Sequence, residues 1–285
     1  MRQKILIWLQ AFRLRTLMLS LSSTFMGSII AYSKGKFNLW VFLLASLTSL
    51  FLQILSNLAN DYGDGIRGSD GINRLGPERV IQSKKITIKE MKIMIIIFIL
   101  LSLISGSALI YVGLLQNTDI KKVIFFIIGV LAIISALKYT IGKKPYGYIG
   151  VGDFFVFFFF GIVGTCGIFY LHTGYFDFWL LLPASSIGFF STGVLNINNI
   201  RDFESDKLNG KKTMVVRLGL KAGKIYHIAL ISIAILLSII YTFILFESFF
   251  QLIFIITIPF FIDNIKNVIK NSKPEKFNNE LKKLV

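Results

Sequence analysis

Long apolar runs, separated by short polar segments, recur along the whole chain. Hydrophobic residues make up 54% of the 285 residues, more than a soluble domain of this size carries. A helix needs about twenty apolar residues to cross a hydrocarbon core of roughly 30 Å. The pattern predicts an all-α, polytopic transmembrane helical bundle of about eight spans that forms one domain, 1–285. The spans are expected to centre near Phe25, Ser49, Leu103, Gly129, Phe160, Ile187, Ala234 and Phe254.

The positive charge is concentrated in alternate loops. The net charge is +16, but because lysine and arginine lie in short connections between spans, the excess indicates membrane topology, and no nucleic acid partner is expected. The basic segments should be cytoplasmic, which places both termini on that side. They are the amino terminus, 67–92, 138–144, 201–224 and the tail after 266, whereas the intervening connections near Lys34, Lys121, His172 and Glu247 are less basic.

Two polar stretches, NLANDYGDGIRGSD and NINNIRDFESD, end strongly apolar runs. In a helix each places one asparagine and two aspartates on a single face, at i, i+4 and i+7 in the first and i, i+4 and i+8 in the second. An ionised aspartate at membrane depth costs several kcal/mol unless a cation pairs with it. The stretches therefore predict a site that binds metal ions. Its candidate metal ligands are Asn57, Asp61, Asp64, Asn198, Asp202 and Asp206, and the four aspartates are also the candidate catalytic residues.

The donor atoms favour magnesium. With one cysteine and two histidines the usual zinc ligand sets are absent from the sequence, whereas carboxylate and amide oxygens suit Mg²⁺, which keeps some waters and binds substrate phosphates. Both stretches share one side of the predicted bundle, so together they would form a diphosphate cradle with nearby basic residues. Each basic residue could instead be a topology signal, and the aspartates could be solvated helix ends. The candidate diphosphate ligands are Arg67, Arg74, Arg79, Lys143, Lys207, Lys211 and Lys212, and the role of Asp70 is open.

These motifs resemble the paired Asp-rich motifs of the intramembrane aromatic prenyltransferases, the UbiA superfamily. The resemblance covers nearly the whole chain. Four segments are most similar to the 1,4-dihydroxy-2-naphthoate polyprenyltransferase branch, which serves menaquinone synthesis: FRLRTL, NDYGDGIRGSD followed by RLGPERVIQS, YTIGKKPYGYIGVGDFFVFFFFG, and NNIRDFESDKLNGKKTMVVRLG.

The resemblance implies transfer of a polyprenyl group from polyprenyl diphosphate to 1,4-dihydroxy-2-naphthoate, with loss of CO₂, giving demethylmenaquinone. Mg²⁺ would stabilise the charge that develops on the leaving diphosphate. An apolar, aromatic pocket would keep water from the allylic cation. We therefore expect a multi-pass protein of the bacterial cytoplasmic (inner) membrane.

Further residues receive roles only through the resemblance. Tyr139 and Lys143 match a Tyr-x3-Lys loop motif that contacts the diphosphate. The acceptor-binding candidates are Arg13 and Arg15, which match an amino-terminal basic pair, Tyr146, and Asp153, which could instead cap its helix. Tyr148 is a further aromatic candidate, and the run from Phe154 to Phe160 is expected to face lipid or the helix core.

Several features leave alternatives open. Superfamily members commonly have nine spans, and the equal offset between the two motifs suggests parallel repeat halves of about 1–141 and 142–285. The loops from Gly63 to Thr87 and from Asp202 to Gly219 are expected to cap the cytoplasmic mouth. The rival functions are a prenyltransferase for another acceptor, such as 4-hydroxybenzoate, and an ion-coupled secondary transporter. The donor chain length and the oligomeric state do not follow from the sequence.

Overall fold

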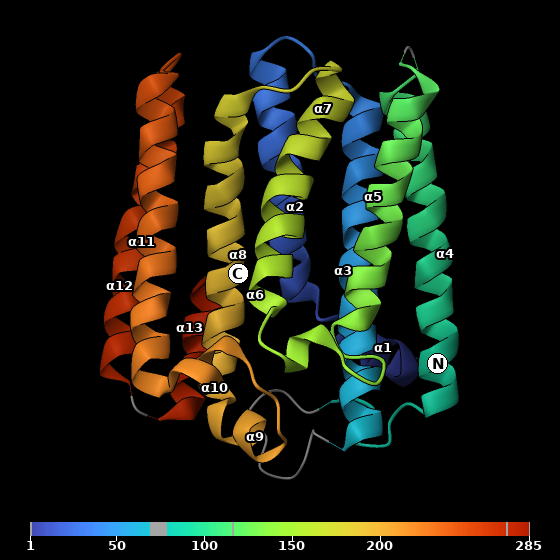
Figure 1. Ribbon diagram of the computed structural model, residues 1–285, viewed down its shortest axis with the longest axis vertical. Helices are drawn as coiled ribbons and strands as arrows, with labels where there is room; N and C mark the ends of the chain where they lie inside the picture. The colour runs from blue at the N-terminus through green and yellow to red at the C-terminus, as the bar shows by residue number, and fades with distance from the viewer. Residues whose placement is uncertain (1, 69–78, 116, 272, 285) are drawn as a thin grey trace.

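Every regular element in the part of the chain that the structure describes is a helix. The computed structural model describes residues 2–68, 79–115, 117–271 and 273–284 (Figure 1). Eight helices in it are long and apolar enough to span a membrane, which confirms the predicted bundle. They are α2 (Leu14–Ser33), α3 (Leu39–Arg67), α4 (Ile88–Gly113), α5 (Asp119–Lys138), α6, η2 and α7 together (Gly152–Thr173), η3 and α8 together (Phe178–Arg201), α11 (Leu220–Ile244), and η4 and α12 together (Phe249–Lys270).

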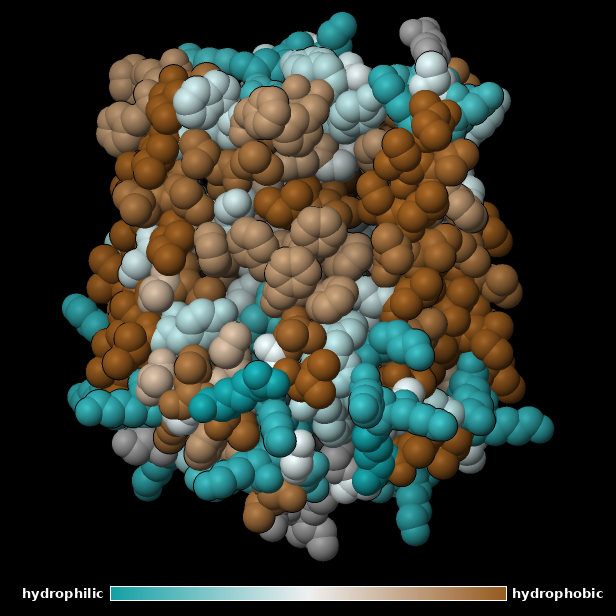
Figure 2. All heavy atoms as spheres, viewed as in Figure 1, coloured by the Kyte–Doolittle hydropathy of each residue, from teal (hydrophilic) through white to brown (hydrophobic). Residues whose placement is uncertain are grey.

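Most of the shorter helices lie near one end of the bundle (Figure 1). The helices α9 and α10 lie at its lower end in Figure 1, and the amino-terminal helix α1 lies at the same end. The bounds of the short helices are α1 (Arg2–Phe12), η1 (Tyr146–Tyr148), α9 (Phe203–Leu208), α10 (Met214–Leu218), η5 (Pro274–Lys276) and α13 (Phe277–Leu284). Charged side chains gather at this end, and a broad apolar band covers the outside of the spans (Figure 2).

Local sequence signals fix where the spans begin and end. The side chain of Asn38 accepts the backbone N–H groups of Trp40 and Val41 at the start of α3. The same helix ends at Gly68, whose φ of 67° is the left-handed conformation that glycine adopts without strain. Thr87 and Glu90 form a capping box at the start of α4. The long α3 therefore carries the first Asp-rich stretch in its last turns.

The span α8 is the most buried of the eight, with α11 and η2 packed against it. The element η2 (Phe157–Gly167) is a π-helix, which the apolar pattern did not predict. Glycines allow it to approach its neighbours closely. A Cβ atom on Gly161 would lie 2.5 Å from the carbonyl oxygen of Ala184 in α8, and one on Gly164 would lie 2.6 Å from Ser23 Oγ in α2.

We expect Gly161→Ala to destabilise the bundle by about 1–3 kcal/mol, because the added methyl group meets backbone atoms that cannot move aside. Thermal unfolding in detergent measures the effect. Gly129→Ala in α5 is the matched control, since a Cβ there has no heavy atom within 4 Å. Equal midpoints for the two variants would contradict this account of the helix contact.

Candidate active site

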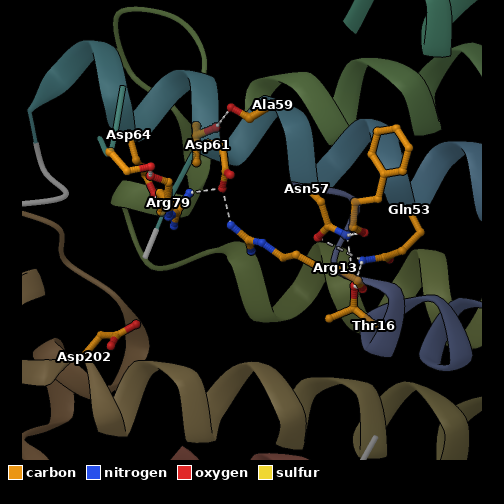
Figure 3. A network of polar contacts seen from close by, with 12 residues as sticks. Arg13, Thr16, Gln53, Asn57, Ala59, Asp61, Asp64, Arg79 and Asp202 are labelled. Atoms are coloured by element: carbon orange, nitrogen blue, oxygen red, sulfur yellow. Dashed lines mark hydrogen bonds and ion pairs between the residues drawn. The ribbon is translucent and has the colours of Figure 1, made fainter. Parts of the chain in front are cut away.

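The two Asp-rich stretches lie at the same end of the bundle, on α3 and at the junction of α8 and α9. Asp61 and Asp64 lie in the last turns of α3, Asp202 follows the last residue of α8, and Asp206 lies in α9. Figure 3 shows Asp202 apart from Asp61 and Asp64, with its carboxylate turned toward the space between the two helices. The fold thus brings the four predicted carboxylates to one end of the bundle (Figure 1).

The first pair of carboxylates is bridged by one buried arginine. Arg79 Nη1 lies 2.9 Å from Asp61 Oδ1, and its Nη2 lies 2.8 Å from Asp64 Oδ2 (Figure 3). Arg13 also donates to Asp61 Oδ1. Both carboxylates and Arg79 are buried, so the guanidinium groups offset the cost of removing these charges from water.

Arg13 reaches this site because of its backbone. Its φ of 52° is a left-handed conformation, unusual for a residue other than glycine, and it separates α1 from α2. Thr16 Oγ1 then donates to the Arg13 carbonyl oxygen at 2.9 Å. The break between the two helices therefore aims the Arg13 side chain at α3. Arg15 is exposed and makes no comparable contact among the described residues.

The carboxamide of Asn57 takes part in a polar network on the cavity wall. Its Nδ2 donates to the Phe12 carbonyl oxygen and to Thr16 Oγ1, both at 2.9 Å, and its Oδ1 accepts from Gln53 Nε2 at 3.3 Å (Figure 3). In this structure the asparagine joins α3 to the α1–α2 break. Its counterpart Asn198 donates to the Val194 carbonyl oxygen at 3.2 Å.

The second pair of carboxylates has its own cations. Arg201 donates two parallel hydrogen bonds to the Asp202 carboxylate, from Nε to Oδ1 at 2.8 Å and from Nη2 to Oδ2 at 2.7 Å. Lys211 Nζ lies 3.8 Å from Asp206 Oδ1. Burial disfavours the charged form of Lys211, but the carboxylates of Asp64 and Asp206 outweigh it and raise the lysine pKa.

Tyr148 joins the two motifs. Its hydroxyl donates to Asp64 Oδ1 at 2.7 Å, and its ring has Arg67 at 4.9 Å and Lys211 at 5.3 Å from the centroid. Its carbonyl oxygen accepts the backbone N–H of Lys212 at 3.0 Å. The sequence analysis named Tyr148 only as an aromatic candidate. Its position in the segment YTIGKKPYGYIGVGDFFVFFFFG, which resembles the prenyltransferases, was the feature that could have indicated a role near the carboxylates.

Two other tyrosines lie on the cavity wall near the motifs. Tyr146 stacks on Phe155 with a centroid distance of 4.1 Å, and Tyr139 meets the Tyr146 ring edge-on at 5.3 Å. Burial raises the pKa of Tyr146 to about 12, although a hydrogen bond with Ser135 opposes the shift. Burial, followed by the nearby charge of Asp153, raises the pKa of Tyr139 as well. Both rings thus stay neutral at physiological pH.

Other predicted residues do not contact the four carboxylates in the described part of the structure. Lys143 and Lys207 are exposed, Arg67 donates to the Gly142 carbonyl oxygen, and Asp153 is buried. Asp153 is not the capping residue of its helix, which starts after Val151. The candidates Arg74 and Asp70 lie outside the described residues. Sequence reasoning missed Arg201, although the residue adjoins the second motif.

A cavity of about 570 Å³ opens beneath the motifs. Its wall comes from α2 to α5, the fifth span and α8. Polar groups of Arg13, Asn57 and Asn198 lie at the end near the carboxylates, and the rest is mainly apolar. The sequence suggested that the phenylalanine run from Phe154 to Phe160 faces lipid or the helix core. In the structure part of this run lines the cavity instead; the residues are Phe155, Phe158, Phe159 and Phe160.

The donor set fits Mg²⁺. The described residues contain no group of three or more histidine, cysteine, aspartate or glutamate side chains placed to share a metal. Magnesium commonly uses only one or two protein carboxylates and completes its shell with water and phosphate oxygens. The pairs Asp61 with Asp64 and Asp202 with Asp206 meet that need, because each supplies hard oxygen atoms at the end of the bundle where the motif asparagines Asn57 and Asn198 line the cavity.

Known proteins resemble this chain along most of its length. It is 42% identical over 259 residues to 1,4-dihydroxy-2-naphthoate octaprenyltransferase of Haemophilus influenzae, covering 90% of this chain and 83% of the relative. The Escherichia coli protein of the same name is 40% identical over 267 residues, covering 94% and 86%. The fold also matches the structure of a UbiA homolog from Archaeoglobus fulgidus bound to DMAPP and Mg²⁺, with a TM-score of 0.64, 17% identity and coverage of 96% and 94%.

The family assignment agrees with the site. Residues 20–278 match the UbiA prenyltransferase family, and this range contains both Asp-rich motifs and all the spans except the start of α2. The chain belongs to the UbiA prenyltransferase family.

Proposed function

We propose that this protein transfers a polyprenyl group from polyprenyl diphosphate to 1,4-dihydroxy-2-naphthoate in the bacterial cytoplasmic membrane. The allylic carbon–oxygen bond breaks, inorganic diphosphate leaves, a ring carbon bonds to the prenyl group, and the carboxylate departs as CO₂. The product is demethylmenaquinone, formed as its quinol. The observation that carries the proposal is the location of two acidic motifs above one apolar cavity in a chain with naphthoate-using relatives.

The charges of the site suit a diphosphate that binds with metal ions. Bound Mg²⁺ would be held by Asp61, Asp64, Asp202 and Asp206, with Asn198 beside them, and would stabilise the negative charge that develops on the leaving diphosphate. Four aspartates and a diphosphate of roughly three negative charges approach neutrality only with two such ions and several basic side chains. Among the described residues, the basic side chains that pair with the carboxylates are those of Arg13, Arg79, Arg201 and Lys211.

The cavity wall suits the organic half of the donor. Tyr139, Tyr146 and Phe155 present aromatic faces beside the polar end, where they stabilise an allylic cation and exclude water. Below them the apolar wall receives the isoprenoid chain. Arg13 lies on the same wall, and its guanidinium group would attract the acceptor carboxylate.

The geometry does not favour an ion-coupled transporter. Carriers place ionisable side chains near the bilayer midplane, at the interface of their repeats. Here the carboxylates lie in the last turns of α3 and beyond the end of α8, where each is held by arginine or lysine. We infer that this end is cytoplasmic, as are both termini, because the basic loops gather there. The division into halves of 1–141 and 142–285 stays a prediction.

The acceptor assay tests the proposal directly. Membranes that contain the protein are incubated with Mg²⁺, a polyprenyl diphosphate, and either dihydroxynaphthoate or 4-hydroxybenzoate. We expect a prenylated naphthoquinol and release of CO₂ from the naphthoate carboxylate. A lipid product from hydroxybenzoate alone would assign the protein to a different acceptor.

Removing one motif carboxylate should nearly abolish turnover. We expect Asp61→Asn or Asp202→Asn to lower kcat by about 10²-fold or more, because each change removes a charged ligand for the metal–diphosphate group. Initial rates of prenyl transfer measure the loss. Asp119→Asn is the matched control, since that side chain is 96% exposed at the start of α5. Wild-type rates in either motif variant, with normal membrane insertion, would refute the assigned role.

Turnover should also depend on added divalent metal. We expect excess EDTA to stop product formation and an equivalent excess of Mg²⁺ to restore it, because the carboxylates hold the diphosphate only through the metal. Rates measured across a Mg²⁺ titration check this. Undiminished turnover in EDTA would mean that the basic residues alone hold the donor.

A further inference from the structure

The helix α13 reaches the second Asp-rich motif through a buried arginine. Arg201 uses Nε and Nη2 for Asp202, and its Nη1 donates to Asn278 Oδ1 of α13 at 3.0 Å. The Arg201 side chain is 4% exposed, so water does not supply an alternative acceptor. The planar guanidinium group is thus held on two edges, one facing Asp202 and the other facing α13.

Apolar packing holds α13 against α8. Phe277 is buried in a cluster with Ile197, Ile200, Val215 and Val268. Ile197 and Ile200 belong to the last turns of α8, next to Arg201. A shift of α13 would therefore disturb the helix end that carries the motif.

A buried polar contact fixes the register of α13 against α12. Asn264 Nδ2 donates to Glu280 Oε2 at 3.1 Å and to the Glu280 carbonyl oxygen at 3.3 Å. Asn264 Oδ1 lies 3.0 Å from His227 Nε2 of α11. Because buried polar groups are costly when unpaired, these contacts favour one position of α13 along its neighbours, and that position sets Asn278 opposite Arg201.

We propose that Asn278 is a positioning residue for the metal–diphosphate site, acting through Arg201 on Asp202. The inference rests on the proposed function, because it concerns the same site. Asn278 Oδ1 orients the guanidinium group, which in turn orients the two carboxylate oxygens while each keeps further lone pairs for a metal. Residues that orient a metal ligand from behind typically change metal affinity by about 10–100-fold when they are lost.

The test measures metal binding apart from turnover. The purified protein in detergent is titrated with Mn²⁺ in the presence of inorganic diphosphate, and free Mn²⁺ is followed by electron paramagnetic resonance. We expect Asn278→Leu to weaken Mn²⁺ binding about tenfold and to raise the apparent KM for Mg²⁺ similarly, with the KM for the acceptor unchanged. Asn278→Asp keeps an oxygen acceptor for Arg201 and should remain within about threefold of wild type on the same scale.

Asn279→Leu is the matched control, since this neighbouring side chain on α13 is exposed. Its Mn²⁺ affinity should equal that of the wild type. Wild-type affinity in Asn278→Leu, or equal losses in the Leu and Asp variants, would overturn the proposal. If Asn278→Leu does not fold, Asn278→Ala removes the same oxygen atom without adding an apolar chain, and the same outcomes apply.

Failure of the proposed function gives a different result. A wild-type protein that binds Mn²⁺ with diphosphate but does not prenylate dihydroxynaphthoate would refute the acceptor assignment and leave the role of Asn278 standing. Normal prenyl transfer, with Mn²⁺ binding insensitive to Asn278→Leu, would refute only the positioning role.

Discussion

Four buried or half-buried carboxylates at the edge of the bilayer are the constraint on which the rest of this structure depends. Each would be costly to remove from water alone, and each has a cation within reach. Arg79 serves Asp61 and Asp64 together, whereas Arg201 and Lys211 serve the second motif. Arg79, which precedes α4, and Lys211, which follows α9, lie in connecting segments and contact these carboxylates, whereas Arg201 is the last residue of α8. The segments that carry Arg79 and Lys211 are therefore part of the site, because the buried carboxylates need these positive charges.

The spans and the motifs could be predicted from the sequence, because they depend on local pattern. Apolar length gave the eight helices, and helical spacing placed Asp61 and Asp64 on one face, where one guanidinium group contacts both. Local pattern did not predict which basic side chains would pair with the aspartates. Lys143 and Lys207 carry the same charge as Arg79 yet lie exposed, since loop folding rather than composition decides which side chain turns inward.

Two further features were hidden from sequence reasoning for physical reasons. Successive side chains on a helix point in different directions, so helical spacing does not predict a contact between Arg201 and Asp202. Asp202 is the C-cap residue of α8, and its carboxylate accepts two hydrogen bonds from Arg201 there. The π-helix η2 has the apolar composition of an ordinary membrane span, and the i→i+5 backbone hydrogen bonds that define it leave no mark on that composition. Its placement converts part of a phenylalanine run into cavity wall.

The hydrogen bond between Arg201 and Asn278 joins residues 77 positions apart, with the last two spans between them. A ribosome that has released the chain through α9 has therefore delivered all four aspartates but not the Asn278 amide that contacts Arg201. Arg201, at the carboxyl-terminal end of α8, acquires this contact only after α11 and α12 have been inserted. Completion of this contact is thereby tied to the order of translation, and a nascent chain that stops before α13 carries all four aspartates without the hydrogen bond from Arg201 to Asn278.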